Sequence, residues 1–256
     1  MIESTFIATP EFEPVLKRLG LVDAGSVFSD PRIRAWRSIT ERENCTLDFE
    51  DEGRKRRFHV KRFVANGSGV SPAEAEVAGI RLLVQEGIPT VKLVAHGRAG
   101  DGRSFIIVED LAGFEPGGRL IGKNFDFERV ASRLAEFVAR LHRRLHHRDL
   151  YLCHVFIHPG TLDLRLIDAG RVRRLPPWPF RRRWIIKDLA QLFYSMSGAG
   201  VSDVLKTQTL RAYAKCAGIK NFEALLSAVK KKEARIARHD MNLKRRNPER
   251  DVSLSY

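Results

Sequence analysis

Cysteine is scarce in this chain of 256 residues. The three cysteines, Cys45, Cys153 and Cys216, are odd in number and have no C-x-x-C spacing. Small secreted proteins that depend on disulfides carry paired cysteines, because a cross-linked framework stabilises a core that is otherwise too small. The sequence therefore argues against a disulfide framework and favours a reducing compartment, with the cytosol as the default.

Long apolar runs are missing as well. No stretch approaches the roughly 20 apolar residues that cross a bilayer as a helix, so any membrane contact is expected to be peripheral. Residues 1–14 contain acidic residues and prolines where a secretory signal has a basic start and an apolar run, so we expect no signal peptide. We find no internal repeat or low-complexity tract.

Negative charge is in deficit. The chain has 31 acidic residues against 45 lysines and arginines, which gives a formal net charge of +14. Such an excess indicates a polyanionic partner: nucleic acid, an anionic membrane face or a phosphorylated substrate. Charge alone does not choose among them. A hydrophobic content of 43% is typical of a globular chain, long enough for one two-lobed domain or two small ones.

Strand-like and helical patterns divide the chain into two parts. Strands are predicted at residues 34–40, 45–50, 58–63, 91–95 and 104–109, with a polar turn at 51–54 and one helix from Ser71 to Gly87. Helices are predicted at 127–145 and 181–197, and two more at 203–247. The change in pattern at 110–118 predicts an α+β protein with an N-terminal lobe, 1–112, built on a small antiparallel sheet, and a mainly helical C-terminal lobe, 113–256.

The stretch from His147 to Gly170 organises the chain. Residues 155–158 and 164–167 alternate as short strands around a Pro-Gly turn, so a hairpin is predicted. Its outer ends carry Asp149 and Asp168, which the pairing of the strands brings close together. One carboxylate in such a pair accepts a proton from an attacking hydroxyl, while the other holds a magnesium ion against phosphate oxygens.

A lysine and a glutamate upstream suit the same chemistry. Lys61 projects from the strand at 58–63, and Glu76 in the following helix could reach back to pair with it. Glu74 competes for that role, and both acids also suit the first turn of a helix. A solvated strand lysine is the alternative interpretation of Lys61.

The order of these residues resembles the signature set of protein kinases: Lys61, Glu76, Glu109 to Leu111, His147-Arg148-Asp149 and Asp168-Ala169-Gly170. The resemblance implies a two-lobed kinase-like fold whose N-terminal lobe clamps the nucleotide. It implies that Asp149 is catalytic and that Asp168 holds Mg²⁺. Lys61, Glu76, Glu109 and Leu111 then bind ATP. Arg148 stabilises the loop, and Asp188 hydrogen-bonds the backbone of that loop.

A narrower resemblance rests on Tyr151, Cys153 and His154, with Glu86 to Thr90 and Trp184 to Leu189 as further matches. These residues are similar to those of the bacterial lipopolysaccharide kinase family of the Kdo/WaaP type. The resemblance implies ATP- and Mg²⁺-dependent phosphorylation of a sugar hydroxyl, on Kdo or heptose, in the inner core of lipopolysaccharide. The implied partner is the anionic lipid A-core acceptor, met at the cytoplasmic face of the inner membrane, and no nucleic acid is expected.

Two departures from the protein-kinase pattern concern the nucleotide. His154 stands where protein kinases have asparagine, and it is expected to contact cofactor or metal; because Mg²⁺ prefers oxygen, hydrogen bonding to Asp149 or to a phosphate is the alternative. No glycine lies between Gly25 and Gly53, so no glycine-rich loop precedes Lys61. The phosphates must then be covered in another way.

Other interpretations remain open at this stage. His142 and His146 have the i, i+4 spacing of a zinc site, although no cysteine pair assists them. The basic segments 171–174, 181–183 and 230–246 are either solvated faces or an acceptor surface, and the aromatic residues among the arginines either touch lipid or pack. Rival functions are a protein or small-molecule kinase of the same fold, and an inactive basic module that binds nucleic acid or membrane.

Overall fold

The computed structural model describes residues 3–65, 69–123 and 125–246. The chain divides into two compact units, residues 1–81 with 91–112, and residues 82–90 with 113–256. The second unit thus also includes residues 82–90, which precede the boundary expected at 112. Residues 247–256 of the predicted second lobe lie outside the described part.

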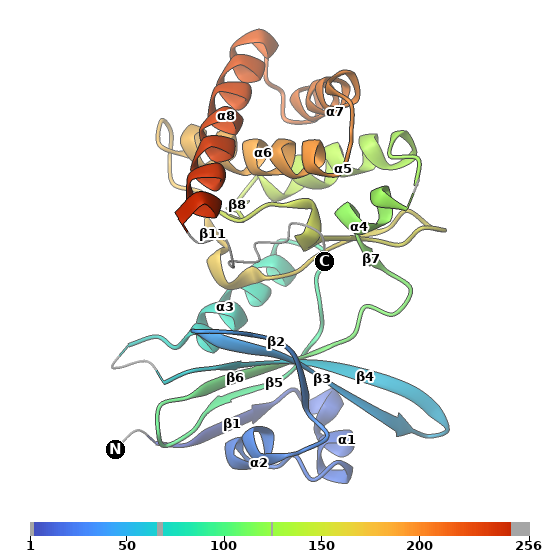
Figure 1. The fold of residues 1–256 in the computed structure, drawn as a ribbon, viewed down its shortest axis with the longest axis vertical. Helices are drawn as coiled ribbons and strands as arrows, with labels where there is room; N and C mark the ends of the chain where they lie inside the picture. The colour runs from blue at the N-terminus through green and yellow to red at the C-terminus, as the bar shows by residue number, and fades with distance from the viewer. Residues whose placement is uncertain (1–2, 66–68, 124, 247–256) are drawn as a thin grey trace. The chain divides into compact units, whose positions relative to one another are not determined.

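A six-stranded antiparallel sheet forms the first unit (Figure 1). The strand order is β1-β5-β6-β4-β3-β2. The strands are β1 (Thr5–Ala8), β2 (Arg34–Ile39), β3 (Arg42–Asp51), β4 (Arg54–Phe63), β5 (Leu93–Arg98) and β6 (Ser104–Glu109). Strand β1 was not predicted, because its four residues carry too short a pattern to recognise.

The β3–β4 hairpin extends further toward its turn than the sequence pattern suggested. Asp51 pairs with Arg54, and Glu52 and Gly53 between them both have positive φ, 51° and 73°. Two consecutive residues of this kind form the tight turn whose twist matches that of paired strands. The charged residues 54–57 therefore belong to β4, although they lack the apolar alternation of Phe58 and Val60.

Two short helices, α1 (Glu13–Arg18) and α2 (Ala24–Ser29), complete the core of this unit. Their buried side chains Leu16 and Val27 join the same cluster as Phe58 and Phe105 from the sheet. Each apolar side chain of this size buried in such a core contributes about 1.5–3 kcal/mol. Gly20, which follows α1, has the positive φ of 73° that suits a helix end.

Helix α3 (Pro72–Gln85) begins and ends as the sequence predicts. The Ser71 amide donates to Glu74 Oε2 at 2.7 Å, and the Glu74 amide donates to Ser71 Oγ at 3.2 Å. This reciprocal pair is a capping box, which satisfies two amides that the first turn leaves without helical partners. Gly87, with φ of 67°, follows the last turn.

Helices dominate the second unit. They are α4 (Gly117–Gly122), α5 (Glu128–Leu141), α6 (Arg181–Gly198), α7 (Asp203–Cys216) and α8 (Phe222–Arg246). Helix α6 packs against α8, and α5 packs against α7 (Figure 1). Short strands complete the unit: β7 (Glu115–Pro116), β9 (Val155–Ile157) and β10 (Leu164–Leu166) form one sheet, and β8 (Leu145–His146) pairs with β11 (Arg173–Arg174). The predicted α+β class and the 155–166 hairpin are confirmed.

The predicted helix at 127–145 is too long by four residues at its C-terminal end. Helix α5 ends at Leu141, and the chain turns before Leu145 pairs with Arg174. The Leu175 amide also donates to the Arg144 carbonyl at 2.8 Å. Tertiary pairing with a distant strand thus overrides the helical periodicity. No helix within residues 3–65, 69–123 and 125–246 is both long and apolar enough to span a bilayer.

Candidate active site

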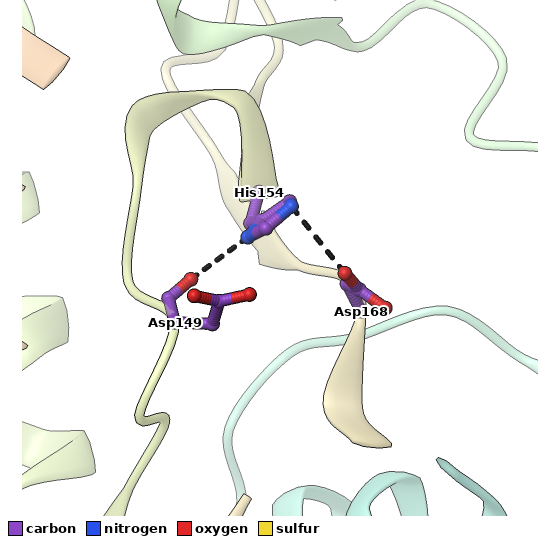
Figure 2. Close-up of side chains that lie close together, drawn as sticks. All are labelled: Asp149, His154 and Asp168. Atoms are coloured by element: carbon purple, nitrogen blue, oxygen red, sulfur yellow. Dashed lines mark hydrogen bonds and ion pairs between the residues drawn. The ribbon is translucent and has the colours of Figure 1, made fainter. Parts of the chain in front are cut away.

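Asp149, His154 and Asp168 lie together in the second unit (Figure 2). Asp149 precedes a single 3-10 turn, Leu152–His154, that leads into β9, and Asp168 follows β10. Antiparallel pairing sets Val155 opposite Leu166, so the two outer ends of the hairpin meet. One ligand atom from each of the three side chains lies within 4.8 Å of the others. The proximity of the two carboxylates, predicted from the hairpin, is thus present.

His154 bridges the two aspartates. Its Nδ1 lies 2.8 Å from the carbonyl oxygen of Asp149, and its Nε2 lies 3.4 Å from Oδ2 of Asp168. Both neighbours are acceptors, so each ring nitrogen faces a group that favours an N–H. Burial opposes protonation, but Cys153, Asp168 and the Asp149 carbonyl outweigh it and raise the pKa of His154 to about 10. The imidazolium form is therefore the one that this environment favours.

The donor set bears on which metal the site could hold. Two carboxylates this close to each other fit a hard divalent cation such as Mg²⁺, which takes oxygen ligands. An imidazolium has no lone pair to offer a metal. Among the described residues, this is the only group of three or more acidic, histidine or cysteine side chains with such spacing.

Asp188 of α6 holds the backbone of the loop that carries Asp149. Its carboxylate accepts hydrogen bonds from the amides of His147 at 2.6 Å and Arg148 at 2.8 Å. Burial opposes its charge, but the hydrogen bonds from His142 and from the His147 amide keep the pKa of Asp188 below its usual value. The expected bond between Asp188 and the loop backbone is confirmed. It fixes Arg148 in a left-handed conformation with φ of 68°, directly before Asp149.

The histidine pair considered for zinc has other contacts. His142 donates through Nε2 to Asp188, and its Nδ1 lies 2.9 Å from the hydroxyl of Tyr213. His146 stacks on Trp184 with ring centroids 4.8 Å apart. Neither belongs to the cluster of ligand-type side chains in the described residues, so the zinc alternative finds no support.

Gln191 and Ser195 are site residues that sequence reasoning missed. Gln191 accepts from the Leu150 amide at 3.3 Å, and Ser195 Oγ accepts from the Leu152 amide at 2.9 Å. With Asp188 they occupy positions i, i+3 and i+7 of α6, which share one helical face, and all three are buried. A polar stripe at helical spacing in an otherwise apolar segment was the signal available in the sequence.

The carboxylate of Asp149 is held from two sides. Gln191 donates through Nε2 to Asp149 Oδ1 at 3.3 Å and also to the Tyr151 hydroxyl at 3.2 Å. A guanidinium nitrogen of Arg171 lies 3.9 Å from the same Oδ1. These contacts orient one oxygen, and the described part of the chain offers no hydrogen-bond partner to the other, Oδ2.

In the first unit, Lys61 and Glu76 form a close ion pair. Lys61 Nζ donates to Glu76 Oε1 at 2.6 Å, and the side chain of Glu76 is 6% exposed. Glu74 caps the helix through Ser71, so the competition between the two glutamates is decided by their positions on α3. A pair so buried is far more constrained than a solvated strand lysine.

Glu109 and Leu111 follow in the segment that leaves β6. The side chain of Glu109 accepts from Arg56 at 2.8 Å, and its amide donates to the Lys92 carbonyl. Between them Asp110 lies 2.7 Å from His59 Nε2. Leu111 is partly buried and lies outside any helix or strand. Their proposed contact with nucleotide stays a prediction.

Two solved structures with a similar fold are aminoglycoside phosphotransferases. An aminoglycoside-3′-phosphotransferase of type VIII matches with a TM-score of 0.55 and 18% identity, over 86% of this chain and 100% of that chain. The aminoglycoside phosphotransferase APH(3″)-Id from Streptomyces rimosus matches with a TM-score of 0.56 and 16% identity, over 86% and 98%. At these identities the likeness concerns the fold, and it confirms the predicted kinase-like class.

The relatives found by sequence share one name, which is more specific than those of the solved structures. The chain is 33% identical over 162 residues to the lipopolysaccharide core heptose(I) kinase WaaP of Pseudomonas aeruginosa, a match that covers 55% of this chain and 59% of the relative. The enzyme of the same name from Escherichia coli K12 is 31% identical over 164 residues, 56% and 60% of the two chains. The matches thus span less than two thirds of these relatives' own length.

A family model decides the assignment. The model of the lipopolysaccharide kinase (Kdo/WaaP) family matches residues 25–213, which include strands β2 to β6 of the sheet, the hairpin with both aspartates, and helix α6. The resemblance seen in Tyr151, Cys153 and His154 is thereby confirmed. On this evidence the chain belongs to the lipopolysaccharide kinase (Kdo/WaaP) family.

Proposed function

We propose that this protein is an ATP- and Mg²⁺-dependent kinase that phosphorylates a sugar hydroxyl of the lipopolysaccharide inner core. The observation that carries the proposal is the Asp149–His154–Asp168 cluster in a chain of this family. Within the core sugars, the named relatives favour a heptose over Kdo. The acceptor is then a lipid A-core glycolipid, met at the cytoplasmic face of the inner membrane.

Asp149 takes the role of catalytic residue. Gln191 and Arg171 engage its Oδ1, which leaves Oδ2 to receive the proton of the acceptor hydroxyl. The hydroxyl oxygen forms a bond to the γ-phosphorus of ATP, the bond from that phosphorus to the ADP oxygen breaks, and Asp149 takes the proton. Catalysis of this kind depends on positioning and charge neutralisation rather than on a covalent intermediate.

Charge neutralisation falls to Lys61 and to a metal ion that Asp168 would hold. A bound Mg²⁺ would withdraw charge from the phosphate oxygens, and Asp168 is the oxygen ligand proposed to hold it. We assign His154 to a positioning role, because its two nitrogens already engage Asp149 and Asp168. Lys61, fixed by Glu76, is proposed to contact the phosphates of ATP. Glu109 and Leu111 are proposed to contact the nucleotide.

The test is transfer of labelled γ-phosphate from Mg²⁺-ATP to purified lipid A-core that carries both Kdo and heptose. We expect label on a heptose, located by mass spectrometry of the released core sugars. Replacing Asp149 by Asn keeps the hydrogen bond to Gln191 but removes the proton acceptor, and it should lower kcat by about 10²–10⁴-fold. Label on a protein or an aminoglycoside and none on the glycolipid would overturn the proposal.

Asp163→Asn is the matched control for Asp149→Asn. Asp163 lies at the distal turn of the same hairpin, where it hydrogen-bonds Thr161, and has no contact with the Asp149–His154–Asp168 cluster. Its turnover should stay within about twofold of wild type. Equal losses in the two variants would mean that the hairpin fold, not the Asp149 carboxylate, limits turnover.

A further inference from the structure

A basic groove lies between α6 and α8 in the second unit. It encloses about 530 Å³, within the range of about 300–1,000 Å³ that small-molecule sites occupy. Its lining includes five cationic side chains, Arg183, Lys187, Lys231, Lys232 and Arg235, beside the indole of Trp184. No acidic residue of the described part of the chain lines it.

The cations of this groove have no acidic partners among the residues that the structure describes. Within the described residues, none of the five is in an ion pair. Two of the acids of α8 are engaged elsewhere: Glu233 binds Lys206 at 3.0 Å, and Asp240 binds Lys244 at 3.0 Å and accepts from the hydroxyl of Tyr194. Like charges held together in a concave site repel one another and raise the local concentration of anions. The charge of the groove therefore favours an anion as its occupant.

The groove adjoins the loop that carries Asp149. Lys187 lines the groove, and its ammonium donates to the carbonyl of Arg148 at 2.7 Å, one residue before Asp149. Trp184 forms a second link, because the guanidinium groups of Arg148 and Arg183 both lie 4.6 Å from its ring centroid. A molecule whose anionic group occupied the groove would thus have its neighbouring atoms beside the catalytic loop.

We propose that this groove is a subsite for the acceptor, in which Lys231, Lys232, Arg235 and Arg183 bind an oxyanion, phosphate or carboxylate, of the glycolipid whose hydroxyl is phosphorylated. The inference rests on the proposed function and adds the part of the substrate that is recognised. Guanidinium groups bind such oxyanions through two parallel hydrogen bonds, which fixes orientation as well as position. Anchoring the charged group in this way sets which hydroxyl reaches Asp149.

The concave shape of the groove favours an acceptor molecule over a membrane surface as its occupant. A membrane surface attracts exposed lysines and arginines on a convex or flat face, whereas these cations line a concavity. Trp184, which would serve as the interfacial anchor, is instead half-buried under arginine side chains.

The experiment compares two variants that lose the same charge. The groove variant carries Lys231→Gln, Lys232→Gln and Arg235→Gln; the control carries Lys220→Gln, Lys230→Gln and Arg238→Gln, which are exposed and lie outside the groove. Both are measured for kcat, for KM of acceptor and of ATP, and for equilibrium binding of lipid A-core without ATP. We expect the groove variant alone to bind acceptor about tenfold more weakly, with a matching rise in acceptor KM and an unchanged KM for ATP.

The binding arm separates this inference from the proposed function. Groove-specific loss of lipid A-core binding supports the subsite even if no phosphate is transferred, and in that case only the proposed function fails. Normal turnover with an unchanged acceptor KM in the groove variant overturns the subsite and leaves the function standing. Equal weakening in both variants also overturns it, because the effect is then one of net charge.

Further arms identify the oxyanion and test the rival surface. The binding measurement is repeated with enzymatically dephosphorylated lipid A-core. If the difference in affinity between wild type and groove variant disappears, the groove binds phosphate; if the difference persists, the groove binds sugar carboxylates. Vesicles of phosphatidylglycerol without acceptor test the membrane. If they bind wild type and control but not the groove variant, the groove is a membrane contact and the proposal is wrong.

Discussion

Single buried polar residues hold the loop that carries Asp149 in place. Asp188, Gln191 and Ser195 accept hydrogen bonds from backbone amides of the loop, and without them these amides would be buried and unsatisfied. An unsatisfied buried donor costs about 1–3 kcal/mol, so each of these side chains has a measurable effect on stability. The loop conformation is thus set by residues about 40 positions away in the sequence.

Asp188→Asn tests this dependence. An asparagine offers one acceptor oxygen where two amides now find two, so one of the His147 and Arg148 amides loses its partner. We expect the free energy of unfolding to fall by about 1–3 kcal/mol in urea titrations, and kcat to fall more than KM for ATP rises. Asp203→Asn is the control, because the side chain of Asp203 is 77% exposed and its ion pair contributes at most about 1 kcal/mol. Equal unfolding midpoints for Asp188→Asn and wild type would contradict the assignment.

His146 gives the protein a pH-dependent stability. Burial lowers its pKa from 6.5 to about 4, and its buried Nδ1 has no hydrogen-bond partner within the described residues. The unfolded chain therefore binds this proton more readily than the folded one. The contribution of neutral His146 to the free energy of unfolding is fully present above pH 6.5 and is lost as the pH falls from 6.5 to 4.

His146→Phe should remove that part of the pH dependence while it preserves the stacking on Trp184. Urea unfolding at several values between pH 7.5 and 4.5 measures it. We expect wild type to lose about 1–3 kcal/mol more than the variant over this interval. Parallel stability curves for the two proteins would show that folding does not change the pKa of His146, and they would refute the prediction.

At the scale of elements, close backbone approach explains why β1 joins the sheet. A Cβ added at Gly97 would lie 2.1 Å from the carbonyl oxygen of Thr5 and 2.9 Å from Cε1 of Phe105. The pairing of β1 with β5 thus requires glycine at this position, which is a tertiary constraint that the short β1 sequence does not reveal.

Gly97→Ala is expected to separate β1 from β5 or to shift Phe105. The free energy of unfolding should fall by about 1–3 kcal/mol, as for an overpacked core. Gly198→Ala is the matched control: nothing lies within 4 Å of an added Cβ at the end of α6, and alanine should change stability by a few tenths of a kcal/mol up to about 1, in the favourable direction. Amide exchange at β1 locates the effect, and unchanged protection there in Gly97→Ala would rule out the constraint.

Elements were predicted where their patterns were local. The capping box of Ser71 and Glu74 marks the start of α3, and the alternation of residues 155–157 and 164–166 marks the hairpin. Errors arose where distant contacts decide the structure. Leu145 continues the apolar periodicity of α5, yet it pairs with Arg174 of β11. The backbone groups of this segment thus find their hydrogen-bond partners in a distant strand and not in a further turn of the helix.

At the scale of the whole molecule, the net charge of +14 predicted a polyanionic partner. The structure distributes this charge unevenly: Arg18, Arg56 and Arg174 are paired with acids, whereas the cations of the α6–α8 groove have no such pair within the described part of the chain. The net charge attracts anions over a long range, whereas cations without an acidic partner in a concave site can bind one particular anion. The second property is the one that bears on which acceptor is bound.

The sequence by itself determined the family and the fold class. The order of Lys61, Glu76, Asp149 and Asp168 was enough for the kinase-like class, and Tyr151, Cys153 and His154 for the lipopolysaccharide kinases, because the residue types and their spacing are local and one-dimensional. Tertiary structure alone decided which glutamate pairs with Lys61, that His154 engages both aspartates, and that α6 supplies the acceptors for the loop. These contacts join residues whose separation in sequence carries no signal, since side-chain direction and burial arise only when the elements pack.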